Sequence, residues 1–205
     1  MLNKKMHQFL RPKSRGHFMC AVLCSMALLG IVQPSNAVAS DAASLINVDV
    51  AKRGEQVVVD VNFEVAVTPQ QAWEVLTDFD HMRDFVSNLQ MSRVVTRNGT
   101  RWQVAQKGAT RRGPLHFSFE SVRDLDLVPF DRITSKQVSG NMKKFEATTR
   151  LSAQSGGTRI QYHAESIPNT FVPPVVGTAF IETESRRQFE EMRSEMLRRS
   201  ALAAK

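Results

Sequence analysis

Hydrophobic and polar residues alternate along much of the chain after residue 56. In Val57–Val67 the odd-numbered positions carry valine or phenylalanine, and Asp60, Asn62 and Glu64 fall between them. A repeat of two residues is typical of a β-strand with one buried face. Similar patterns predict six more strands, at about 91–96, 101–107, 115–127, 132–139, 143–153 and 158–166.

Two short helices are expected between the first and second strands. Thr68-Pro69-Gln70-Gln71 has the pattern of a capping box, with threonine before the helix, proline at its first position and glutamine at its third. This helix runs to about Thr77, and a second one spans about 81–85.

A long helix is expected over about 175–202. It carries an apolar stripe at helical spacing, formed by Phe189, Met192 and Met196. Toward the start of the helix the stripe becomes polar and consists of Thr178, Glu182 and Ser185. A fully packed helix rarely buries a glutamate. The first half of this helix is therefore expected to face something other than a tight core.

The order of these elements predicts an α+β fold of the helix-grip type. A curved seven-stranded antiparallel sheet wraps around the long C-terminal helix, and the two short helices follow the first strand. The last helix is the one long enough to cover the apolar face of such a sheet. A sheet that holds a helix along only part of its length leaves a pocket between them.

The N-terminal part has the features of an export signal. A basic stretch to His17 is followed by an apolar run from Phe18 to Val32 and then by Ala37-Val38-Ala39, which has the small-residue pattern of a cleavage site. The alternative, a membrane anchor, needs about 20 apolar residues, more than this run has. We therefore expect a cleaved secretory signal at 1–39, a loose segment at 40–54 and one domain at 55–202. The product is expected to be periplasmic or secreted, and soluble.

Removal of the leader lowers the net charge of the chain. The whole chain has 27 basic and 20 acidic residues and a net charge of +7. Five of the basic residues and none of the acidic ones lie in 1–39, so the remainder carries a net charge of +2. An exported protein of nearly neutral charge is not expected to bind nucleic acid.

No metal or cofactor is expected. Both cysteines, Cys20 and Cys24, lie in the leader, so the exported chain has no thiol ligand or nucleophile. Its three histidines are far apart in sequence and lack the spacing of a metal site.

One basic patch remains in the exported chain. It consists of Arg93, Arg97, Arg101, Lys107, Arg111 and Arg112, and no acidic residue occurs between Asp84 and Glu120. Such a patch can contact an anionic membrane surface or an acidic partner protein, and it can equally be the solvated side of a sheet. The glycine-flanked segment at 107–113 is interpreted as a loop that gates the pocket.

The segment Val65–Phe79 (VAVTPQQAWEVLTDF) resembles the opening of the START-like helix-grip (SRPBCC) superfamily. Its polyketide cyclase/dehydrase branch, which includes coenzyme Q-binding START proteins, is the most similar. The segment Phe171–Gly177, before a charged terminal helix, also fits. The resemblance covers about residues 55–200. It implies a cavity between sheet and helix that binds lipids, quinones, steroids or polyketides, and it implies no catalytic residue.

The predicted ligand-binding residues are those that face this cavity: Trp102, Phe117, Phe119, Phe145, Tyr162, Phe171, Thr178, Glu182 and Ser185. Two of them have a second interpretation. Tyr162 is also consistent with a core tyrosine, and Glu182 with an ion pair to Arg186 one turn further on. Glu182 is the candidate for a catalytic group.

We therefore expect an exported binder or carrier of a hydrophobic or amphipathic small molecule, and more readily a non-enzyme than an enzyme. The alternative is a cyclase or dehydrase that acts on an aromatic or polyketide-like substrate.

Overall fold

The structure is a computed structural model that describes residues 46–112, 115–169 and 174–205; of residues 112, 115–117 and 174–176 only the backbone is described. The predicted signal at 1–39, the first part of the predicted loose segment, and Phe171 lie outside the described residues. The described residues belong to one unit, Ser40–Lys205.

One antiparallel sheet of eight strands dominates this unit, in the order β1-β2-β8-β7-β6-β5-β4-β3. The strands are β1 (Asn47–Arg53), β2 (Gln56–Val65), β3 (Leu89–Asn98), β4 (Arg101–Arg112), β5 (Leu115–Val128), β6 (Arg132–Gly140), β7 (Met142–Gln154) and β8 (Gly157–Pro168). Neighbours in sequence are neighbours in the sheet, except that β8 returns to pair with β2. The predicted helix-grip class is confirmed.

The sheet has one strand more than predicted, because residues 47–53 form β1 instead of a loose segment. The pairing of β1 with β2 runs from Asn47 opposite Asn62 to Arg53 opposite Gln56. The strands are joined at Gly54, whose φ of 62° suits glycine. Val48 and Val50 share one face, but an edge strand of seven residues with four polar ones gives a weak sequence signal.

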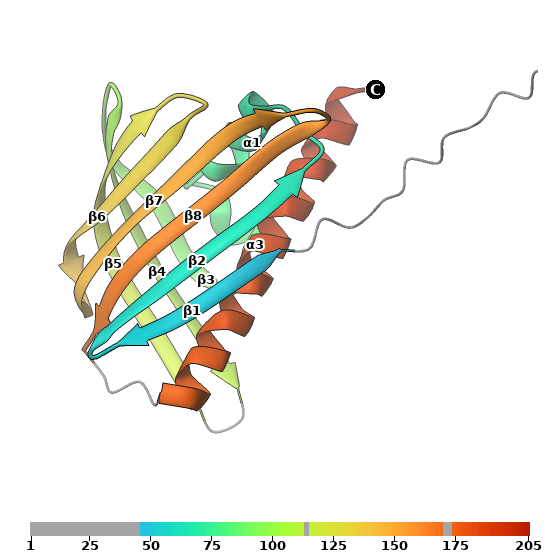
Figure 1. Cartoon of the computed structure of the whole chain (residues 1–205). Coiled ribbons are helices and arrows are strands. Elements are labelled where there is room, and N and C mark those ends of the chain that lie inside the picture. The colour runs from blue at the N-terminus through green and yellow to red at the C-terminus, as the bar shows by residue number, and fades with distance from the viewer. Residues whose placement is uncertain (1–45, 113–114, 170–173) are drawn as a thin grey trace, which may run out of the picture. The chain divides into compact units, whose positions relative to one another are not determined.

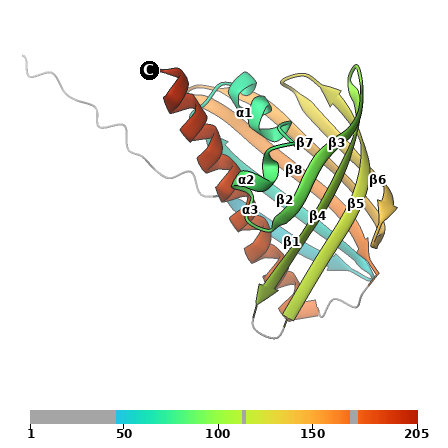
Figure 2. The ribbon, with the colours of Figure 1, turned by 180° about the vertical axis from the view of Figure 1, so that it is seen from behind.

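Three helices accompany the sheet: α1 (Pro69–Leu76), α2 (Met82–Phe85) and α3 (Pro174–Ala203). The predicted capping box of α1 is present. The amide of Gln71 donates to the Thr68 hydroxyl, and the Thr68 amide donates to the Gln71 side chain. The sheet curves, and α3 lies along its open side next to β1 (Figures 1 and 2).

The space between sheet and α3 is filled with apolar side chains at the end where α1 lies. Phe63, Ile160, Phe189 and Met196 are each at most 5% exposed. The Phe63 and Phe189 rings are 5.9 Å apart. The predicted apolar stripe of the last helix therefore forms part of the main core.

The segment predicted as a gating loop at 107–113 continues β4 as far as Arg112. Gly108 is paired with both Leu89 and Phe119. A Cβ atom at Gly108 would lie 2.4 Å from the Asn88 carbonyl oxygen and 2.5 Å from the Phe119 ring. Here glycine permits close packing of the strand against its neighbours, so it does not mark a loop.

Candidate functional site

The inner face of the sheet is incompletely covered near the start of α3. Many inward-facing side chains in this half keep accessible surface, although the smaller Val57, Ala147 and Ala164 among them are buried. The partly accessible ones are Val59, Phe119, Arg123, Gln137, Phe145, Thr149, Tyr162 and Ser166. In the other half the corresponding side chains, such as Leu125, Leu127 and Ile160, are buried. The interior is thus filled at one end and accessible at the other.

Polar side chains from β3, β4, β5, β6 and β8 lie on this inner face. We call Ser92, Gln106, Arg123, Ser135, Gln137 and Tyr162 the interior polar cluster. The pairing of strands brings them together, since Gln137 lies opposite Arg123, and Ser135 lies opposite Leu125 on the same two strands. Each of these residues occupies a position in its strand at which the alternation of side chains points inward.

Arg123 is the central residue of the interior polar cluster. Its Nη2 donates to Oε1 of Gln106, whose Nε2 in turn donates to the Ser92 hydroxyl at 2.9 Å. The guanidinium carbon lies 5.6 Å from the centre of the Phe145 ring. Burial lowers the pKa of Arg123, because desolvation disfavours its charged form. An arginine nevertheless stays protonated at neutral pH.

Several polar atoms of the cluster have no hydrogen-bond partner among the described residues. Arg123 Nε, Ser135 Oγ and Gln137 Oε1 are buried without one. Buried polar atoms in native proteins are nearly always bonded to protein, water or ligand. These atoms therefore mark a place where a polar group of another molecule is favoured.

Tyr162 lies at the boundary between the filled and the accessible half. Its ring is 5.1 Å from that of Phe189. Burial raises the pKa of Tyr162 to about 12, and the charge of Arg123 opposes this only in part. The hydroxyl therefore remains protonated and available as a donor. The residue therefore borders the core and also faces the cluster.

The residues of α3 divide into an inward stripe and two flanks. On the flank toward β1, Arg186 donates to the Ile46 carbonyl and forms an ion pair of 3.1 Å with Glu182. On the other flank, Thr110 of β4 donates to Glu184 at 2.6 Å. The stripe between them contains Ser185, which is half-buried.

Glu182 therefore occupies the ion pair that the sequence offered as its second interpretation. Its side chain is 45% exposed. A carboxylate in this setting is poorly suited to general acid–base chemistry, which favours a desolvated group.

The structure brings only part of the predicted ligand set together. Phe119, Phe145 and Tyr162 face the interior on β5, β7 and β8, and half-buried Thr178 and Ser185 share the inward phase of α3. Trp102 instead packs at the filled end, 6.3 Å from Phe79. The Phe117 side chain and Phe171 lie outside the described residues.

Sequence reasoning missed Arg123, Gln106, Ser135 and Gln137. Arg123 did leave a signal, because it has the phase of Leu125 and Leu127 on the buried face of its strand. The other three are polar residues on half-buried strands and have no comparable signal.

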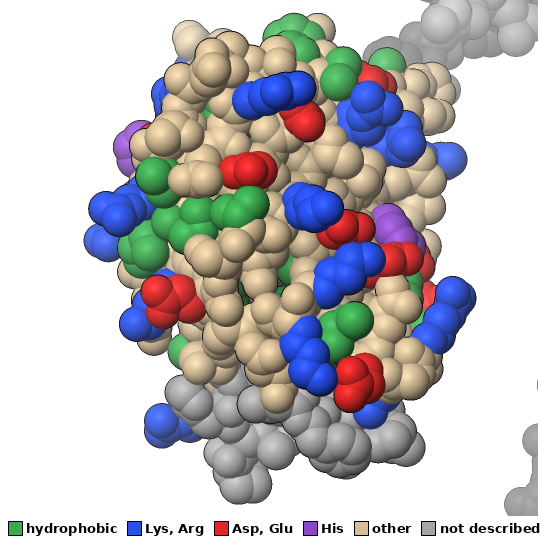
Figure 3. All heavy atoms as spheres, turned by 90° about the vertical axis from the view of Figure 1, so that its left-hand side faces the viewer, with side chains coloured by type: hydrophobic (Ala, Val, Ile, Leu, Met, Phe, Trp, Pro, Cys, Tyr) green, Lys and Arg blue, Asp and Glu red, His purple; other side chains and the backbone are tan. Residues whose placement is uncertain are grey.

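The hydrogen-bonded ladder between β6 and β7 stops beside the interior polar cluster. Its pairs run from Arg132 with Arg150 to Lys136 with Glu146. Beyond them the Gln137 side chain donates to the Met142 carbonyl at 2.8 Å. Val138 nearby is 52% exposed. Figure 3, which views the molecule from the left-hand side of Figure 1, shows a hollow in this surface.

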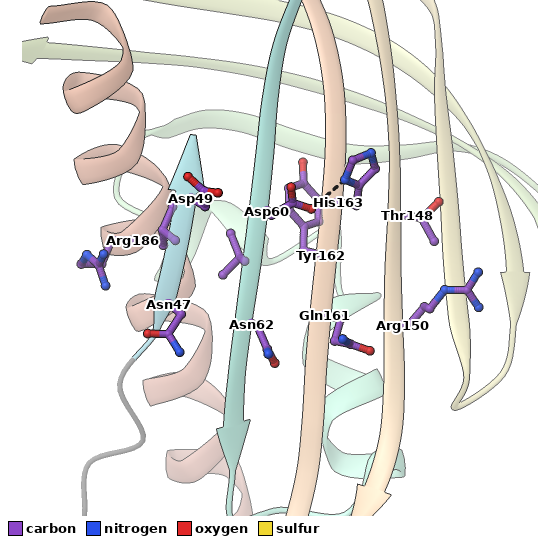
Figure 4. Close-up of a pocket in the computed structure, with 12 residues that line it drawn as sticks. Asn47, Asp49, Asp60, Asn62, Thr148, Arg150, Gln161, Tyr162, His163 and Arg186 are labelled. Atoms are coloured by element: carbon purple, nitrogen blue, oxygen red, sulfur yellow. Dashed lines mark hydrogen bonds and ion pairs between the residues drawn. The ribbon is translucent and has the colours of Figure 1, made fainter. Parts of the chain in front are cut away.

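A separate hollow of about 670 Å³ lies over β1, β2, β8 and β7 (Figure 4). Most of its lining comes from outward-facing polar residues, among them Asn62, Gln161 and the pair Asp60 and His163, which is joined at 2.7 Å. Val48, Val61 and Tyr162 also line this hollow, but its many charged and amide side chains distinguish it from the largely apolar interior.

The basic patch is only partly free of acidic neighbours. Arg97 pairs with Asp80 at 3.0 Å, and Arg101 with Asp126 at 3.4 Å. In the described part of the chain, Arg93, Lys107 and Arg111 form no ion pair. The Arg112 side chain is outside the described residues.

Among residues 46–112, 115–169 and 174–205, no group of three or more histidine, cysteine, aspartate or glutamate side chains is arranged to hold a metal ion. Within the same ranges, none of the helices combines the length and the apolar character needed to span a membrane.

Residues 65–193, well over half of the chain, match the protein family described as polyketide cyclase / dehydrase and lipid transport. Comparison with curated protein sequences gives no match.

Solved structures share the fold at low sequence identity. The Zhui aromatase/cyclase from a Streptomyces species has 15% identity and a TM-score of 0.60, and the match covers 71% of this chain and 96% of that one. A STAR-related lipid transfer protein fragment from Xanthomonas axonopodis has 11% identity and a TM-score of 0.58, over 73% and 98% of the two chains. A Thermus thermophilus protein has 13% identity and a TM-score of 0.60, over 70% and 99%.

Proposed function

Because the chain belongs to the polyketide cyclase/dehydrase and lipid transport family, we propose that it is an exported binder or carrier of a hydrophobic or amphipathic small molecule. The ligand, a lipid, quinone or polyketide-like molecule, lies between the accessible half of the sheet and the first half of α3.

The observation that carries this proposal is the contrast between the two halves of the interior. At the filled end, apolar side chains from sheet and helix meet and exclude water. At the other end Phe119, Phe145 and Tyr162 face inward and remain partly accessible. Leaving aromatic surface unburied costs about 25 cal/mol for each Å². A bound apolar molecule would recover this free energy.

Export and membrane docking complete the proposal. The leader at 1–39 supports passage out of the cytoplasm. The three patch cations without an ion pair, Arg93, Lys107 and Arg111, would bring a carrier to anionic lipid headgroups.

Native mass spectrometry of the chain, expressed from its full-length sequence and purified from the compartment that it reaches, tests this function. A co-purifying mass that disappears on denaturation, together with saturable uptake of the neutral apolar dye Nile red, is expected. Absence of both results would refute the carrier function. Recovery of the chain from the cytoplasm with its leader still attached would refute export.

The alternative of a cyclase or dehydrase has one observation in its favour. The Tyr162 hydroxyl, a donor with a pKa of about 12, has no hydrogen-bond partner among the described residues and is close enough to feel the charge of Arg123. A hydroxyl donor and a cation that both reach one carbonyl group can polarise it. This enzyme would lose turnover in Tyr162→Phe but keep it in Glu182→Gln. Absence of turnover of polyketide-like substrates by the wild-type chain would count against it.

A further inference from the structure

Arg123 is a cation in the protein interior without a carboxylate partner. Among the described residues its bonding partner is the neutral side chain of Gln106, and its nearest aromatic neighbour is Phe145. Charges inside proteins are normally paired, because transfer of an unpaired charge out of water is costly.

Three of the four half-buried arginines of α3 follow that rule, and the fourth, Arg193, donates to the Glu64 carbonyl at 3.3 Å. Arg186 pairs with Glu182, Arg187 with Glu184, and Arg199 with both Glu195 and Asp78. The hydrogen bond to Glu195 raises the pKa of Arg198, whereas burial lowers the pKa of Arg123. The setting of Arg123 is that of a cation whose counter-charge is missing.

The short internal stretches whose side chains are not described contain no carboxylate that could supply that charge. Neither 112–117 nor 170–176 contains an aspartate or glutamate. The guanidinium has five N–H donors, and one of them is used by Gln106. The remaining donors include the pair that binds two oxygens of one carboxylate or phosphate side by side.

We propose that the polar end of the ligand is an anionic oxygen group, a carboxylate or a phosphate monoester, which binds the Arg123 guanidinium. This inference rests on the proposed function and names the class of ligand. Tyr162 is placed to add a hydroxyl donor, and Phe119 and Phe145 supply apolar contacts for the chain of the ligand. Gln106 accepts a hydrogen bond from the guanidinium and is itself held by its hydrogen bond to Ser92.

The test uses the chain expressed from its full-length sequence and the displacement of Nile red at pH 8. Three competitors share a 12-carbon chain: dodecanoic acid, its methyl ester and dodecyl phosphate. We expect at least one of the anions to displace the dye at about tenfold lower concentration than the ester, since a charge-assisted hydrogen bond contributes that much or more. The two anions together show whether a carboxylate or a phosphate is preferred.

Three variants separate the role of Arg123 from a general effect of charge. Arg123→Gln is expected to bind Nile red but to lose the preference for the anion. Arg123→Lys keeps the positive charge but not the planar guanidinium, and it is expected to keep part of the preference for the anion. Arg93→Gln, which removes an exposed and unpaired cation, is expected to behave as wild type. If Arg123→Gln fails to bind the dye, Arg123→Met provides the same comparison.

The outcomes distinguish the two levels of the proposal. Equal displacement by acid, phosphate and ester in the wild-type chain overturns the anion site and leaves the carrier function standing. An anion preference that persists in Arg123→Gln and Arg123→Met also overturns it. If Nile red and all three competitors fail to bind, the carrier function and the anion site fall together.

Discussion

Arg199, near the end of α3, donates a hydrogen bond of 2.8 Å from Nη2 to Oδ2 of Asp78, in the turn between α1 and α2. The same guanidinium donates from Nε to Glu195, one turn earlier, at 2.7 Å. The last part of α3 is therefore fixed to the first short helix by charge as well as by apolar packing. This is the filled end of the interior, away from the proposed ligand site.

The Glu195 carboxylate should make the stability of the chain depend on pH. Hydrogen bonds from Arg198 and Arg199 lower the pKa of Glu195 to about 2, although burial opposes the shift. Because the folded pKa is below the ordinary value of 4.5, the stabilisation is complete above about pH 4.5 and is lost as the pH falls toward 2.

Glu195→Gln is therefore expected to reduce the free energy of unfolding by roughly 1–3 kcal/mol at pH 7 and to have little effect near pH 2. Urea unfolding at a series of pH values measures this. Glu190→Gln, which alters an exposed carboxylate of the same helix, is the control. An equal loss of unfolding free energy at pH 7 and near pH 2 would show that the effect is not electrostatic.

Replacement of Arg123 by methionine should leave the ligand-free chain at least as stable as wild type. The change removes a desolvated charge that has no carboxylate partner among the described residues, which relieves a penalty of several kcal/mol. This offsets the loss of the charged hydrogen bond to Gln106, about 2 kcal/mol, and of the contact with the Phe145 ring. Thermal unfolding of ligand-free protein measures it. A loss of several kcal/mol would mean that Arg123 is needed chiefly for folding.

Gly108→Ala should destabilise the sheet where β4 lies between β3 and β5. The added methyl group would come within 2.5 Å of both the Asn88 carbonyl oxygen and the Phe119 ring. Overpacking of this kind costs about 1–3 kcal/mol. Chemical denaturation is the measurement, and Ser118→Ala, at an exposed position of β5, is the control. Unchanged stability would show that the strands can separate there without cost.

The basic patch should bind anionic membranes chiefly through its cations that lack ion pairs. Neutralising Arg93, Lys107 and Arg111 together is expected to weaken binding to phosphatidylglycerol vesicles roughly 100-fold at low salt, at about 1 kcal/mol for each cation. Vesicle sedimentation measures this.

Arg97→Gln with Arg101→Gln is the matched control for the patch, and it is expected to have a smaller effect because both side chains already pair with aspartate. An equal effect for each neutralised charge in the two sets would indicate that only the total charge matters. Absence of wild-type binding would refute membrane docking.

Much of the fold could be predicted because its signals are local. The alternation in Val57–Val67 and the capping box at Thr68 depend on residues close together in sequence, and both predictions are confirmed. Strand β1 was missed because it lies at the sheet edge and its hydrophobic and polar residues alternate only weakly.

The site could be predicted less completely because it depends on the register between strands. Arg123 comes next to Gln137 and Gln106 only through the pairing of β5 with β6 and β4, which no single segment of sequence specifies. The same limit explains the wrong prediction for Trp102. Its side chain points inward, as the alternation predicts, but it lies at the filled end of the interior. The aromatic residues Phe119, Phe145 and Tyr162 were found because alternation alone determines the face on which they lie.

The filled half of the interior has a consequence for how such a chain can evolve. The fully buried residues of the core, from Phe63 to Met196, are different residues from Phe145 and Gln137, which are half-buried in the proposed ligand site. Substitutions at positions such as Phe145 or Gln137 can therefore change what is bound at little cost to the core. A lineage built in this way can diversify its ligands while the architecture that carries them persists.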